Sequence, residues 1–167
     1  MSVKSMNDLF IHSLRDVYSA EKQILKALPK MIKEIKSDEL KRAFETHLAE
    51  TEGQITRLEK VFESCHSSIR GTKCEAIEGI IHEAQEMMDD VEDEEVLDAA
   101  ILSSSQAVEH YEIARYGTLV AWADELGLKE ASSLLKQTLE EEKNADRTLS
   151  EIAKARINPM ARQPGLI

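Results

Sequence analysis

The amino-acid sequence predicts an all-α protein, a single domain over residues 1–167 that folds as a four-helix bundle. The composition is typical of helices, because glycine and proline together number nine while alanine, leucine, glutamate and lysine are abundant. Apolar residues recur at steps of three and four along most of the chain, which is the period of an amphipathic helix. Short polar breaks separate these stretches, so the helices are long.

The first half of the chain predicts two long helices, over residues 5–36 and 38–63. Ser5 is a capping residue for the first helix, with Asp8 three positions later. Ser37 and Asp38 form the polar break between the two helices. A break this short makes them an antiparallel hairpin.

The second half predicts another hairpin, with helices over residues 94–126 and 128–155 and a tail over 156–167. Gly127 divides the two helices, and glycine commonly ends a helix. A connection of about 30 residues joins the hairpins and contains a shorter helix, residues 76–91. Two hairpins joined by one long crossover form the ferritin-like topology, in contrast to a simple up-down bundle.

The charge balance excludes several classes of partner. The 32 acidic and 21 basic residues give a net charge of −11. A surface this negative repels phosphate groups, so neither nucleic acid nor a membrane surface is an expected partner. The chain shows no membrane-spanning apolar run and no signal peptide, and its two cysteines do not make a disulfide framework. We therefore expect a cytoplasmic protein whose carboxylates bind cations.

Four glutamates, one on each long helix, predict a metal site. Glu21 lies in the middle of the apolar stripe of its helix, where an unpaired carboxylate is unfavourable. The two hairpins resemble each other at an offset of 91 residues, which aligns Glu21 with Glu112. The same offset aligns Glu50 with Glu141. A bundle with pseudo-twofold symmetry brings these four carboxylates together, and such a layer can hold two metal ions.

The choice of ligand is open on two of the helices. Glu142 lies closer to the centre of its apolar stripe than Glu141 does. Glu109 lies one helical turn before Glu112 and faces the same side. Either member of each pair is a candidate ligand.

His47 and Gln54 are further candidates, because they flank Glu50 at spacings of three and four residues. Tyrosines near the layer are candidate hydrogen-bond donors to its ligands, namely Tyr18, Tyr111 and Tyr116. A competing interpretation is that the glutamates form ion pairs at helix seams, and Arg115 is then a candidate partner.

Segments of all four long helices resemble one known family. They are Tyr18-Ser19-Ala20-Glu21-Lys22-Gln23, His47-Leu48-Ala49-Glu50-Thr51, Val108-Glu109-His110-Tyr111-Glu112-Ile113-Ala114 and Thr138-Leu139-Glu140-Glu141-Glu142-Lys143. Together they resemble the bacterial YciF/YciE family of ferritin-like proteins, over almost the whole chain. The resemblance implies a homodimer, a role in bacterial stress responses, and a di-metal centre related to that of rubrerythrins.

The expected metal is iron, two ions per chain, with manganese or another divalent ion as the alternative. Ferritins and rubrerythrins carry a Glu-x-x-His motif at their metal ligands, whereas here Gly53 and Asn144 stand three positions after Glu50 and Glu141. Oxidation of ferrous iron or disposal of peroxide or oxygen is the expected chemistry, and whether the protein is an enzyme is left open. The alternatives are a non-enzymatic structural or partner-binding bundle, and a cage for iron storage.

The homodimer has some support from the sequence as well. The side of residues 94–126 away from the glutamates carries residues too apolar for open solvent, namely Leu102, Ile113, Tyr116 and Val120.

Overall fold

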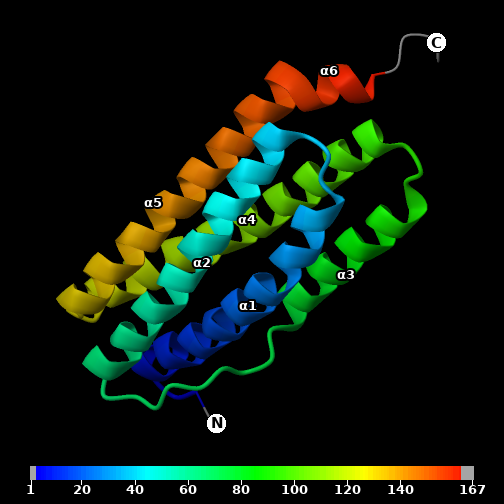
Figure 1. Cartoon of the computed structure of the whole chain (residues 1–167). Helices are drawn as coiled ribbons and strands as arrows, with labels where there is room; N and C mark the ends of the chain where they lie inside the picture. The colour runs from blue at the N-terminus through cyan, green and yellow to red at the C-terminus, as the bar shows by residue number, and fades with distance from the viewer. Residues whose placement is uncertain (1–2, 163–167) are drawn as a thin grey trace.

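The computed structural model describes residues 3–162 and contains five long helices. Their bounds are α1 Met6–Glu34, α2 Asp38–Ser64, α3 Glu75–Asp90, α4 Glu94–Glu125 and α5 Lys129–Ile152. In Figure 1, α1, α2, α4 and α5 form an elongated bundle, and α3 lies along its side beside α1 and α4. The predicted ferritin-like all-α fold is confirmed, and the helices begin and end within a few residues of the predicted positions.

The first hairpin is held by caps and by a buried aspartate from the opposite hairpin. Ser5 Oγ accepts a hydrogen bond from the Asp8 amide at 3.1 Å, as its capping pattern predicts. In the turn between α1 and α2, the carboxylate of Asp98 on α4 accepts from the amides of Lys36 and Ser37 at 2.9 and 2.8 Å. Asp98 thereby ties the α1–α2 turn to the start of α4.

The second hairpin turns at Gly127, whose φ of 71° lies in the left-handed region that favours glycine. The Leu128 amide donates to the Ala123 carbonyl at 2.9 Å, and the Gly127 amide donates to the Asp124 carbonyl at 3.1 Å. These two bonds form a Schellman motif, which satisfies carbonyls at the end of α4 and turns the chain directly into α5.

The chain differs from the predicted tail after α5. One π-helical segment, η1 (Ala153–Ile157), and a short helix, α6 (Asn158–Ala161), continue the chain, and the Ile157 side chain is buried. Residues 156–161 are therefore helical, and Ile157 attaches this segment to the apolar core. The remainder of the predicted tail, residues 163–167, lies outside the described residues.

The core consists of two apolar clusters. One contains residues such as Phe10, Leu14, Leu58, Phe62 and Leu119. The other contains residues such as Leu28, Leu40, Phe44, Ile101 and Leu149. Along α1 the first cluster ends at Tyr18 and the second begins at Ala20, so Glu21 lies where the two meet. Among residues 3–162, every helix is too short or too polar to cross a lipid bilayer.

Candidate metal centre

A layer of buried polar side chains lies where the two apolar clusters meet. Four glutamates in it are each at most 1% exposed: Glu21, Glu109, Glu112 and Glu142. The α2 helix contributes His47 and Gln54, which are also buried. Polar groups buried this deeply in an apolar core require partners, and their number here sets this layer apart from ordinary packing.

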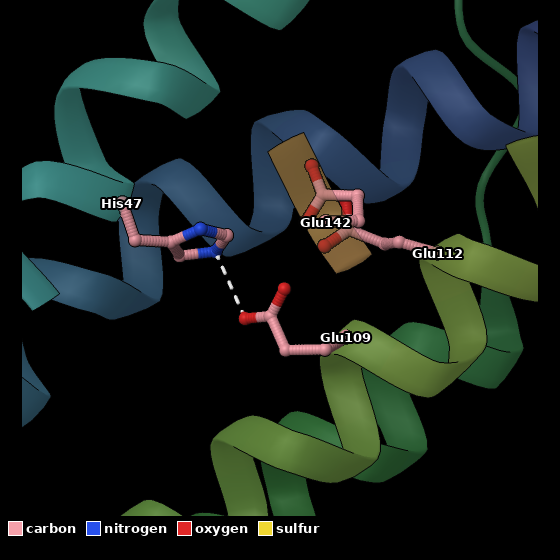
Figure 2. Close-up of side chains that lie close together, drawn as sticks. All are labelled: His47, Glu109, Glu112 and Glu142. Carbon is pink, nitrogen blue, oxygen red and sulfur yellow. Dashed lines mark ion pairs between the residues drawn. The ribbon is translucent and has the colours of Figure 1, made fainter. Parts of the chain in front are cut away.

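Four of these side chains converge closely enough to hold a metal ion. His47, Glu109, Glu112 and Glu142 each offer a ligand atom, and these atoms all lie within 4.8 Å of one another. Figure 2 shows the imidazole of His47 facing Glu109, with Nε2 and Oε1 joined at 3.3 Å. The carboxyl groups of Glu112 and Glu142 lie together beside them in the same view. One imidazole and three carboxylates form a donor set that suits several divalent metals.

Helical spacing explains why these residues face inward. Glu109 and Glu112 are three residues apart on α4, so both project to one side of that helix. On α2 the buried stripe runs through His47, Thr51 and Gln54. The Thr51 hydroxyl donates to the His47 carbonyl at 2.9 Å, so this hydroxyl is satisfied within its own helix.

Hydrogen bonds from two neighbours orient two of the glutamates. The Tyr116 hydroxyl donates to Oε1 of Glu21, and the Gln54 amide donates to Oε1 of Glu142. In each glutamate the other oxygen, Oε2, has no hydrogen-bond partner among the described residues. In both glutamates one carboxylate oxygen is therefore held by a hydrogen bond, and the second oxygen is available to bind a metal ion.

The remaining carboxylate oxygens also lack donors. Both oxygens of Glu112 and both of Glu109 have no hydrogen-bond partner within residues 3–162, apart from the His47–Glu109 contact. An unsatisfied buried acceptor destabilises a protein by about 1–3 kcal/mol, and a charged one by more. The layer therefore has to take up protons or cations.

Burial and mutual repulsion raise the pKa of all four glutamates. Burial, together with the charge of Glu142, raises the pKa of Glu21 to about 8. Burial raises the pKa of Glu109 to about 7. Burial and the charges of Glu21 and Glu142 raise the pKa of Glu112 well above its ordinary value. The pKa of Glu142 is raised well above its ordinary value by burial and by Glu109.

Two of the predicted ligands lie at the margin of the layer. The carboxylate of Glu141 forms two hydrogen bonds to Arg57, at 2.8 and 3.0 Å, and accepts a third from Gln54 at 3.1 Å. Glu50 is half-buried and lines a cavity of about 140 Å³ together with His47 and Glu109. The structure thus brings Glu21 together with the residues of Figure 2, and the ligand roles of Glu50 and Glu141 stay predictions.

Of the three predicted tyrosine donors, Tyr116 reaches a carboxylate of the layer. Tyr18 donates instead to Glu59 at 2.8 Å, and Tyr111 donates to Asp16 at 3.0 Å. The predicted competitor Arg115 is exposed, with its guanidinium over the ring of Tyr111 at 5.3 Å. Sequence reasoning missed Arg57 as the cation that pairs with Glu141. Its spacing within α2 gives no sign of this pairing, because its partner lies on another helix.

Comparison with known proteins places the chain in a family. A family model described as a domain of unknown function, DUF892, matches residues 5–162. The chain is 48% identical over 162 residues to Protein YciF of Escherichia coli strain K12, a match that covers 96% of this chain and 98% of that protein.

Solved structures agree in fold and in extent. The crystal structure of the E. coli stress protein YciF matches with a TM-score of 0.89 and 48% identity, over 93% of this chain and 99% of that one. YcfI of Rhodopseudomonas palustris, described as a candidate structural protein, matches with a TM-score of 0.88 and 49% identity, over 89% and 95% of the two chains. The resemblance predicted from the sequence is confirmed, and the chain belongs to the DUF892 family, a domain family of unknown function.

Proposed function

We propose that the protein binds two metal ions, iron in the first place, in the layer of buried glutamates. The observation that carries this proposal is that six carboxylate oxygens in the layer lack a hydrogen-bond donor among the described residues. Four ionised glutamates carry the charge that two divalent cations neutralise. Bound cations would satisfy the unpaired oxygens and offset the repulsion between the carboxylates, and they would displace the protons that the raised pKa values favour in the metal-free layer.

The proposed ligands are Glu21, Glu109, Glu112 and Glu142, with His47 as the nitrogen donor. Gln54 and Tyr116 act as supports, because each holds one oxygen of a ligand and leaves the second available. Imidazole is a donor that suits iron, and carboxylates are donors that suit manganese, so this donor set is compatible with either metal.

The proposed activity is oxidation of ferrous iron, or removal of peroxide or oxygen, during bacterial stress. Bound iron supplies the electron transfer, and the chain binds the ions and excludes bulk water from them. The exclusion of water is supported by Glu109 and Glu142, which are completely screened from solvent. A role in stress is supported by the description of the E. coli relative as a stress protein.

A non-enzymatic structural bundle is the second candidate function. It is favoured by the description of the R. palustris relative and by the Arg57–Glu141 ion pair, which shows that one glutamate beside the layer is neutralised without metal. Under this alternative, the buried glutamates stay protonated at neutral pH.

Two neighbouring residues give a matched test. Protein is purified without chelator from iron-supplied cells, and iron is measured for wild type, Glu142→Gln and Glu141→Gln. We expect about two iron ions per chain in wild type and in Glu141→Gln. In Glu142→Gln we expect the affinity for iron to fall by about tenfold or more. Circular dichroism checks that each variant is folded.

Two results would contradict the proposal, one against metal binding and one against the choice of ligands. Folded wild-type protein that contains no iron, manganese or other metal supports the structural alternative. Loss of iron in Glu141→Gln with full retention in Glu142→Gln assigns the ligand role to Glu141, the residue selected by the internal repeat.

A further inference from the structure

We propose that divalent cations enter the centre through the cavity between α2, α4 and α5, and that Glu50 is the carboxylate that receives them on the way. This inference rests on the proposed function, because it concerns the route to the same centre. Glu50 then serves as a transit ligand, and the final ligands are the buried residues.

The inner end of the cavity is formed by the centre itself. His47 and Glu109 line the cavity and lie 3.3 Å apart, and each has a ligand atom within 4.8 Å of those of Glu112 and Glu142. Glu109 is fully buried, and neither of its oxygens has a hydrogen-bond partner among the described residues beyond this contact. One residue lining the cavity is therefore a buried carboxylate whose oxygens are available to bind a cation.

Glu50 lines the same cavity and is intermediate in burial between the exposed Thr46 and the buried Glu109. It lies three residues after His47 on α2, so the two side chains face the same side, and both line the cavity. Glu50 is half-buried and has no hydrogen-bond or ion-pair partner within the described part of the chain. Glu141 on α5 forms an ion pair with Arg57, whereas the Glu50 carboxylate forms none and is available to an incoming cation.

Size and charge select what enters. A volume of about 140 Å³ holds roughly five water molecules at about 30 Å³ each, enough for a partly hydrated ion. The exposed residues that line the cavity are the neutral Thr46, Asn144 and Thr148, and no lysine or arginine is among its lining residues. By contrast, the larger groove of about 270 Å³ between α1, α3 and α4 is lined by Lys26 and Lys30 and by no residue of the centre.

The test measures the rate of metal uptake separately from the final occupancy. Metal-free protein is mixed with Co²⁺, whose visible absorption reports binding, and occupancy at equilibrium is measured by dialysis and metal analysis. Glu50→Gln removes the transit charge, and Ala145→Phe fills the cavity, which Ala145 lines. Ala155→Phe is the matched control, because Ala155 lines a neighbouring surface groove that contains no residue of the centre.

We expect Glu50→Gln and Ala145→Phe to slow uptake by on the order of tenfold, with occupancy equal to wild type. Ala155→Phe should change neither quantity. Wild-type rates in both test variants would overturn the route and leave the proposed function standing. A loss of occupancy in Glu50→Gln would make Glu50 a resident ligand and overturn its transit role. Absence of Co²⁺ from wild-type protein at equilibrium would overturn the proposed function, and the route with it.

Discussion

At the scale of single residues, the centre is defined by the difference between paired and unpaired carboxylates. Glu141 and Glu142 are adjacent in sequence and both accept from Gln54, but they differ in burial and in their charged partners. Glu141 receives two hydrogen bonds from Arg57 and remains partly exposed, whereas Glu142 is fully buried beside Glu109 and Glu112. A buried carboxylate without a cation is stable only when protonated, so Glu142 and its neighbours link the stability of the fold to protons and metals.

This linkage predicts how the stability of the metal-free protein depends on pH. The pKa of Glu21 rises from 4.5 to about 8 on folding, and that of Glu109 rises from 4.5 to about 7. The folded state therefore binds more protons than the unfolded state in this range. The stabilisation is fully present below pH 4.5 and is lost as the pH rises through 7 and 8, by at most about 1.4 kcal/mol per pH unit for each group.

Urea unfolding in the presence of a chelator, at a series of pH values from 5 to 8.5, measures this dependence. The free energy of unfolding should fall with rising pH in wild type and fall less steeply in Glu21→Gln. The exposed Glu52→Gln is the control and should follow wild type. A free energy of unfolding that rises over this range would contradict the burial of ionisable carboxylates in the layer.

At the scale of the helices, the phase of each apolar stripe determines which glutamates enter the layer. The internal repeat at an offset of 91 residues paired Glu50 with Glu141, yet both lie at the margin. The stripe of α5 runs through Leu135, Thr138 and Glu142, at steps of three and four. Glu142 was recognisable as inward-facing from this spacing, because the buried apolar residues of α5 determine which face of that helix points into the bundle. The repeat compares positions along the chain and carries no information about that face.

Gly127 is the residue on which the α4–α5 turn depends. Its φ of 71° is unfavourable for a residue with a Cβ, so Gly127→Ala should destabilise the fold by about 1–2 kcal/mol. Gly53→Ala is the control, because a Cβ at this exposed helical position would meet no other atom within 4 Å. It should stabilise the protein by about 0.5–1 kcal/mol. Thermal unfolding compares the stability changes of the two variants. Equal changes would mean that the α4–α5 turn adjusts to alanine without a loss of stability.

At the scale of the whole molecule, connection lengths and periodicity were sufficient to predict the fold. Two tight turns and one long crossover leave few arrangements for four long amphipathic helices. The π-helical segment at Ala153–Ile157 was not predictable, because a sequence pattern at the period of an α-helix does not distinguish one wider turn. The Arg57–Glu141 pair was equally hidden, since it joins two helices and depends on their exact packing.

The oligomeric state stays a prediction. Three of the four residues offered as an apolar outer face of α4 are buried within the single chain, namely Leu102, Tyr116 and Val120. They pack into its own core, so the homodimer loses this support and rests on the resemblance to the YciF/YciE family alone.

Anomalous X-ray scattering locates metal ions in a crystal, and so determines whether the glutamate layer is a metal centre. Crystals of protein purified without chelator and supplied with iron are measured at the iron absorption edge. We expect two strong anomalous peaks per chain among Glu21, Glu109, Glu112 and Glu142, with His47 beside one of them. A map of such crystals with no peak in this layer, or with peaks only on the surface, would contradict this expectation.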